Sequence, residues 1–277
     1  MKVKTVLAGF FLALLAISFP LAYFSYTVPY GLFTVFEGSA SFAFWFSIAG
    51  LVFLYPLSYV GSLFGKYVQK PKGILLFVSY LSVHLVLYGL LLEGLIDYSF
   101  KVASVVTQFT ANLGSVPLYP VSFDSILAGF GFNPSIDLFI PPYFILALSF
   151  YTITLSVIIA VLVLTNIMKV LEIGKMCGVA LKSRTLVVLP ALGVIGGAAC
   201  CLSLPLLISI AAPTAALITN NTVVWYVAYF AFPTVTAVGL KYNMDSTMRI
   251  ATKMSKIVAP KGTTASDEKK NLAGPQA

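Results

Sequence analysis

Charged side chains are scarce in this sequence. Asp, Glu, Lys and Arg together supply 9% of its 277 residues, whereas hydrophobic residues supply 59%. A soluble domain carries about 25% charged residues, so this composition excludes an ordinary soluble fold. We therefore expect a multi-pass protein of the cell membrane, with the lipid bilayer as its main surroundings.

Sequence motifs of enzymes and cofactor-binding proteins are also missing. The single histidine excludes bis-histidine haem ligation, and there is neither a C-x-x-C-H attachment site nor a redox C-x-x-C pair. The sequence holds no Walker motif and no dinucleotide-binding glycine motif. Its apolar segments contain no pair of carboxylates for acid–base catalysis. We therefore expect no enzymatic activity and assign no catalytic residue.

The basic residues carry topological information. The net charge is +8, but the Lys and Arg residues lie at the ends of apolar segments and in a short C-terminal tail. We therefore attribute the charge to membrane topology and expect no nucleic-acid partner.

Six apolar segments are each long enough to cross about 30 Å of hydrocarbon. They cover residues 5–27, 39–64, 73–96, 144–167, 185–212 and 223–240. This pattern predicts an all-α integral membrane bundle of six transmembrane helices within residues 1–257. Six alternating crossings place every Lys and Arg except Lys101 on one side, so we expect both termini in the cytoplasm.

Three connecting segments have their own patterns. In the outer loop, residues 97–142, helical spacing at the start predicts an amphipathic helix or a continuation of span three, and Gly and Pro then predict irregular structure. This loop either covers the outer face or forms a partner surface. Residues 241–257 predict an amphipathic helix on the inner leaflet, and residues 258–277 a disordered cytoplasmic tail. The residues with helical spacing in the loop are Val102, Val105, Val106, Phe109 and Leu113.

The fifth predicted span differs from the others because small residues dominate its segment 191–203. Small residues let neighbouring helices approach closely in lipid, so this helix is a candidate surface for membrane-protein partners. Pro205 donates no N–H, which leaves the carbonyl of Cys201 without its helical partner. Such a carbonyl needs a protein, water or ligand partner within hydrocarbon.

Two adjacent thiols, Cys200 and Cys201, lie within this small-residue helix. They do not form a disulfide with each other, because neighbouring Cα atoms lie about 3.8 Å apart, below the usual disulfide range. His84 lies near the middle of span three, at a similar depth. Thiolate and imidazole are ligands of soft or borderline ions such as Cu(I), Zn(II) or Hg(II), so Cys200, Cys201 and His84 are candidate metal ligands.

A structural interpretation of the same residues stays open. The thiols fit as small packing residues on a Gly- and Ala-rich helix. A neutral histidine hydrogen-bonds a neighbouring Ser or Tyr in many membrane bundles. Adjacent residues on a helix also point about 100° apart, so both thiols reach one pocket only if the helix bends near Pro205.

The segment Cys200–Leu206, CCLSLPL, resembles the Cys-Cys-Leu-x-Pro-Leu segment in the first helix of mercuric-ion transport membrane proteins. In that family the cysteine pair passes the metal across the membrane, which implies the same role for Cys200 and Cys201. The likeness covers seven residues, CCLSLPL. This chain has one more residue before Pro205, and its pair lies in the fifth predicted span.

Two functions are therefore expected from the sequence. The first is binding or passage of a soft metal ion through the cysteine pair. The second is a non-catalytic structural subunit of a larger membrane complex, for example a respiratory one. The small-residue helix 191–203 and the outer loop 97–142 are the candidate partner surfaces for the second function.

Overall fold

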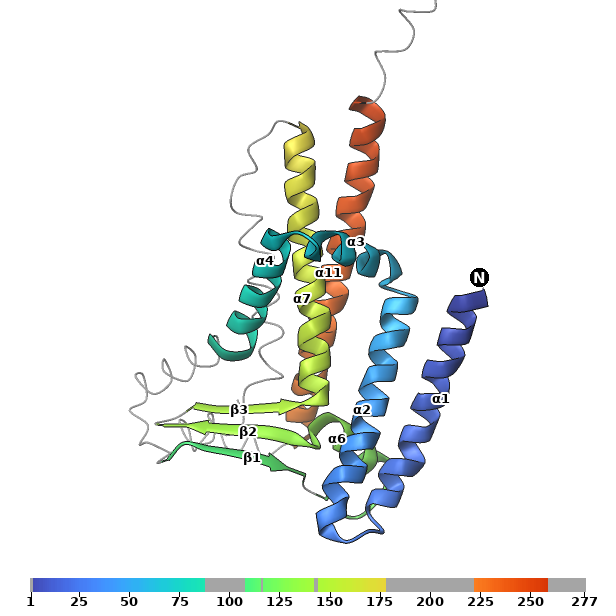
Figure 1. Cartoon of the computed structure of the whole chain (residues 1–277), viewed down its shortest axis with the longest axis vertical. Helices are drawn as coiled ribbons and strands as arrows, with labels where there is room; N and C mark the ends of the chain where they lie inside the picture. Colours follow the sequence, from blue (N-terminus) through green and yellow to red (C-terminus); the bar gives the residue numbers. More distant parts are fainter. Residues whose placement is uncertain (1, 88–107, 116, 142–143, 178–221, 259–277) are drawn as a thin grey trace, which may run out of the picture.

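The computed structural model describes residues 2–87, 108–115, 117–141, 144–177 and 222–258 (Figure 1). Most of these residues are helical. The helices are α1 (Lys2–Ser25), α2 (Tyr30–Leu54), α3 (Ser58–Val68), α4 (Pro71–Ser82), the π-helix η1 (Val83–Leu87), α6 (Phe123–Phe132), α7 (Phe150–Cys177) and α11 (Thr222–Val258). The strands are β1 (Thr110–Gly114), β2 (Ser135–Ile140) and β3 (Phe144–Ser149).

Three of the described helices are long and apolar enough to cross a membrane, namely Val3–Ser25, Tyr30–Leu54 and Phe150–Lys175. A helix rises about 1.5 Å per residue, so more than 20 residues cover about 30 Å of hydrocarbon. These helices are compatible with location in a membrane. The predicted fifth span, 185–212, and the tail from residue 259 onward lie outside the described residues.

The second predicted span, 39–64, has different boundaries in the structure. Helix α2 begins directly after Pro29 and ends at Leu54, and α3 begins at Ser58 after a short break. Proline restricts the residue before it and cannot continue a helix in the normal way, and Pro56 stands within the break. Figure 1 shows α3 turning away from the direction of α2 and running crosswise to α7 instead of continuing α2.

The predicted span 144–167 is also shifted, because its first six residues form strand β3. Helix α7 begins after a reciprocal cap. The N–H of Thr152 donates to Ser149 Oγ at 3.3 Å, and the N–H of Ser149 donates to Thr152 Oγ1 at 2.9 Å. The predicted segments 223–240 and 241–257 together form one uninterrupted helix, α11.

The structure also contains a three-stranded antiparallel sheet, in the order β1-β2-β3, which the predicted all-α fold did not include. Leu113, expected on a helix, lies in β1 and pairs with Ile136 of β2. Leu148 of β3 pairs with Ile136 from the other side. Pairing across the strands satisfies the backbone hydrogen bonds of these segments, and this tertiary gain outweighs the local helical spacing.

Helix α7 forms the centre of the described bundle. Its residues from Ile158 to Leu164 are all buried, and α2, α3, α4 and α11 pack around it. Asn166 joins α7 to α11. Its Nδ2 donates to the carbonyl of Leu240 at 3.1 Å, and Asn243 Nδ2 donates to Asn166 Oδ1 at 2.8 Å.

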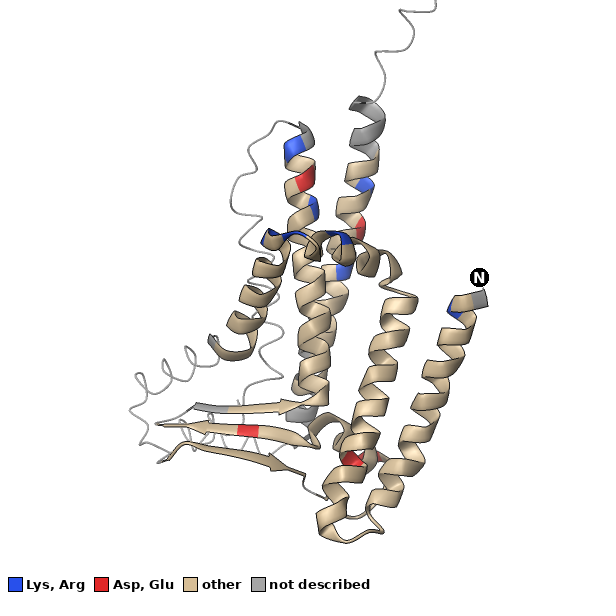
Figure 2. Cartoon of the chain, in the orientation of Figure 1, with Lys and Arg blue, Asp and Glu red and all other residues tan. Residues whose placement is uncertain are grey.

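The described Lys and Arg residues gather at one end of the long helices, where α1 begins and α7 ends (Figure 2). The sheet and α6 lie at the other end (Figure 1). This charge distribution is the one expected when a single face of a bundle contacts the cytoplasm.

Candidate functional site

His84 lies in the π-helical segment η1, which directly follows α4. Single π-helical turns within α-helices are frequent at functional sites, because the extra residue displaces a side chain from the regular helical face. The His84 side chain is 1% exposed, so it lies inside the protein. An ionisable residue at such a position is a candidate functional residue.

The two imidazole nitrogens of His84 have different surroundings. Nδ1 lies 3.5 Å from the hydroxyl oxygen of Tyr80, one helical turn earlier, and the two rings stack with centroids 5.6 Å apart. Nε2 is buried and has no hydrogen-bond partner in the described part of the chain. A buried nitrogen of this kind needs a donor, an acceptor or a metal ion as its partner.

The other two predicted ligands, Cys200 and Cys201, lie outside the described residues, so the structure gives no distance between them and His84. Within the described ranges, no three His, Cys, Asp or Glu side chains form a group that could hold a metal ion. The metal-binding prediction therefore remains a prediction.

Glu37 is a buried ionisable residue to which the sequence assigned no role. It lies on α2 and is 0% exposed. Its Oε2 lies 3.0 Å from the hydroxyl oxygen of Ser25, at the end of α1. Glu37 precedes the predicted second span, 39–64, by two residues. Pro29 was the available signal, because proline commonly precedes or begins a helix and the following apolar run includes Glu37.

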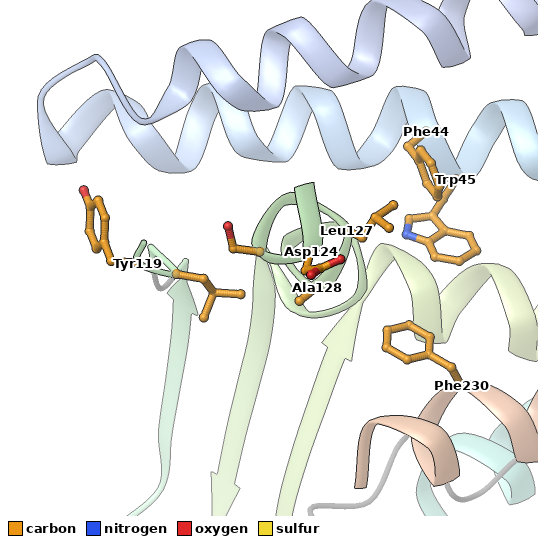
Figure 3. A pocket seen from close by; sticks show the side chains of 9 residues that line it. Phe44, Trp45, Tyr119, Asp124, Leu127, Ala128 and Phe230 are labelled. Carbon is orange, nitrogen blue, oxygen red and sulfur yellow. The ribbon is translucent and has the colours of Figure 1, made fainter. Parts of the chain in front are cut away.

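An aromatic cavity of about 670 Å³ lies beside α6 (Figure 3). Trp45 and Phe230 lie toward one side of this cavity and Tyr119 toward the other, with the Asp124 carboxylate between them. The indole N–H of Trp45 donates to the carbonyl of Phe130 at 2.5 Å, which fixes its ring. Such a cavity, apolar with few polar groups, has the general character of a small-molecule site.

The cationic end of the bundle contains two tyrosine–carboxylate pairs that hold α3. Tyr67 donates to Glu172 Oε2 of α7 at 2.9 Å, and Lys169 reaches the same oxygen at 3.0 Å. Tyr59 donates to Asp245 of α11, and Lys241 pairs with that carboxylate at 2.7 Å. The hydrogen bonds from Lys241 and Tyr59 hold the pKa of Asp245 below its usual value.

A comparison with known proteins found no family model, no curated protein and no solved structure that matches this chain.

Proposed function

We propose that the chain crosses the membrane six times with both termini in the cytoplasm, and that it binds or passes a soft metal ion. In this proposal Cys200, Cys201 and His84 are the ligands. The observation that supports it most directly is the buried Nε2 of His84, which has no hydrogen-bond partner among the described residues. Imidazole nitrogen and thiolate sulfur suit copper, zinc and mercury ions.

The π-helical turn at His84 supports the same proposal. A histidine that binds a metal through one ring nitrogen is oriented by a hydrogen bond to the other nitrogen. The Tyr80 hydroxyl lies 3.5 Å from Nδ1 of His84, where it orients the ring. Nε2 is then the nitrogen left for the metal. A buried thiol stays protonated without a cation beside it. Metal coordination stabilises the deprotonated thiolate and so offsets the cost of its burial.

The test is metal binding by the purified protein. Wild-type protein is titrated with Cu(I), Zn(II) or Hg(II), and the Cys200→Ser, Cys201→Ser double variant is expected to lose binding. His84→Gln removes one of three ligands and is expected to weaken binding by on the order of tenfold or more. Cys177→Ser is the matched control, because it removes the third thiol of the chain. Equal affinity of wild type and the double variant refutes the proposal.

A second proposal is a structural subunit of a larger membrane complex, and the sheet edge favours it. Among the described residues, β1 pairs only with β2, so its other edge has no strand beside it. Phe109 and Leu113 are 65% and 68% exposed. An open edge with exposed apolar residues is a template for another chain, and it belongs to the outer loop 97–142.

Purification from native membranes separates the two proposals. A structural subunit copurifies with stoichiometric partners, and Leu113→Lys on β1 is expected to reduce their recovery. Thr110→Lys is the control on the same strand, since it adds the same charge at a polar position. A monodisperse, metal-loaded protein without partners favours the metal proposal instead.

A further inference from the structure

The Glu37 carboxyl group is buried, and no cation of the described residues neutralises it. Helix α1 packs against α2, and α6 packs over the same part of α2. The described Lys and Arg residues gather at the opposite end of the bundle (Figure 2), and none of them forms an ion pair with Glu37. Burial of an ionised carboxylate without a cation is strongly unfavourable, so such a group takes up a proton or a cation.

The hydrogen bonds of Ser25 indicate which of these two occurs. Ser25 Oγ lies 2.7 Å from the carbonyl oxygen of Ala22 and 3.0 Å from Glu37 Oε2. A hydroxyl group has a single proton to donate, so an ionised Glu37 and the Ala22 carbonyl compete for it. A protonated Glu37 removes this competition. Its own O–H then donates to Ser25 Oγ, and Ser25 donates to Ala22.

The second oxygen of Glu37, Oε1, is also enclosed by the protein. Oε1 is buried, has no hydrogen-bond partner among the described residues, and packs against the backbone of Gly129 on α6. A C=O oxygen of a neutral acid tolerates such a place better than a charged oxygen does. A metal ion would need several further ligands, and within the described ranges no three His, Cys, Asp or Glu side chains form a group that could hold one.

The titratable groups on the surrounding elements are weak acids or other carboxylates. Tyr26 stands in the turn between α1 and α2, and its buried hydroxyl has no hydrogen-bond partner in the described part of the chain. Helix α6 adds Asp124, which lines the neighbouring cavity. None of these groups supplies a positive charge beside Glu37.

We propose that Glu37 is a proton-binding site of the membrane domain, with its carboxyl group neutral at neutral pH and hydrogen-bonded to Ser25. Release breaks the O–H bond of Glu37, the electron pair stays on the carboxylate, and the proton passes to water. Uptake is the reverse step. The site lies at the end of the bundle that carries the sheet, away from the cationic end.

Infrared spectroscopy of the purified full-length protein tests this proposal. At pH 7 the wild type is expected to show the carbonyl band of a protonated carboxylic acid, shifted in D₂O. A solvent-exposed Glu, with a pKa of about 4.3, is ionised at this pH. Glu37→Gln is expected to lose the band. Glu172→Gln, which alters an ion-paired carboxylate, is expected to keep it. If wild type and a folded Glu37→Gln protein give the same spectrum, the proposal is wrong.

Carbodiimide labelling gives a test that does not depend on a Glu37 variant. An apolar carbodiimide reacts with protonated carboxyl groups inside a membrane domain, so the wild-type peptide that contains Glu37 is expected to be modified, less so as the pH rises. The Lys101→Gln variant tests the alternative that an ion pair with a lysine keeps Glu37 ionised, because Lys101 is the basic residue predicted on the outer side. Labelling of Glu37 in Lys101→Gln but not in wild type shows an ion pair and overturns the proposal.

Discussion

Two buried polar side chains near the start of α2, Glu37 and Ser41, lie against α6. Glu37 lies against Gly129, and a Cβ atom at residue 129 would come within 2.5 Å of Glu37 Oε1. Ser41, also on α2, donates to the carbonyl of Asn133 at 2.6 Å, and this hydrogen bond fixes the end of α6 against α2. The absence of a side chain at residue 129 therefore makes room for a carboxyl group.

Gly129→Ala is predicted to destabilise the protein by about 1–3 kcal/mol, because the new methyl group forces Glu37 or α6 to move in a packed interior. Thermal unfolding in detergent measures the change. Gly9→Ala on α1 is the control, since nothing lies within 4 Å of a Cβ atom there. An unchanged unfolding temperature for Gly129→Ala contradicts the described packing.

His84 and Glu37 show what a sequence can predict at the scale of a residue. His84 was selected because it is an ionisable residue within an apolar segment, and its side chain is 1% exposed in the structure. Its ring neighbour Tyr80 lies four residues earlier, as helical spacing allows, whereas the π-helical turn that carries His84 has no local sequence pattern. Glu37 was missed because the apolar run was started at Ser39, past the carboxylate, instead of at the proline-marked beginning of α2.

At the scale of elements, polar contacts between helices hold the cationic end together. Helix α3 is joined to α7 through Tyr67 and Glu172, and to α11 through Tyr59 and Asp245. These residues lie far apart in the sequence, so their pairing depends on the tertiary structure and could not be predicted from spacing. The i,i+4 pair of Lys241 and Asp245, by contrast, follows from helical spacing alone and is present at 2.7 Å.

Acid is predicted to weaken the contact between α3 and α11. Because Asp245 has a lowered pKa in the folded protein, its stabilising contribution is present above the unfolded value of about 3.9 and is lost as the pH falls through the folded value. Unfolding temperatures measured from about pH 6 to about pH 3 are expected to fall less steeply in Asp245→Asn than in wild type.

Tyr59→Phe is the companion variant for this pH series. It removes one of the two hydrogen bonds that lower the pKa of Asp245, while Lys241 remains. Its slope is therefore expected to lie between those of the wild type and Asp245→Asn. Identical slopes for all three proteins contradict a role of this carboxylate in acid sensitivity.

Asn166→Ala is predicted to destabilise the bundle by about 1–3 kcal/mol, because it leaves buried polar groups of α7 and α11 without partners. Asn243→Ala is expected to cost less, since it removes only the bond to Asn166 Oδ1, and Asn243 is half-buried. Chemical or thermal unfolding in detergent measures both. A larger loss for Asn243→Ala contradicts the central position of Asn166.

At the scale of the whole molecule, the sequence predicted a mostly helical membrane protein but not its sheet. Apolar length identified α1, α2 and α7 as segments able to cross a membrane, although the boundaries of two of them shifted. Strand β2 reads in the sequence as a short apolar run with a central Asp137, and its identity depends on pairing with β1 and β3. Long-range pairing of this kind leaves little trace in a single sequence.

The predicted topology can be tested with single cysteines on intact cells. Asp124→Cys, on α6, is expected to react with a membrane-impermeant maleimide from outside. Lys70→Cys, at the cationic end, is expected to react only after the membrane is permeabilised. Both side chains are exposed. The unmodified chain is the control for Cys177, Cys200 and Cys201. Labelling of both variants from the same side contradicts the orientation of the bundle.

The most direct test of the proposed metal function is X-ray absorption spectroscopy of the purified protein loaded with Zn(II). The account predicts sulfur ligands at about 2.3 Å and a nitrogen ligand at about 2.0–2.1 Å. The sulfur signal is expected to disappear in the Cys200→Ser, Cys201→Ser double variant. A wild-type spectrum with oxygen and nitrogen ligands alone, or a sulfur signal that survives in the double variant, contradicts the account.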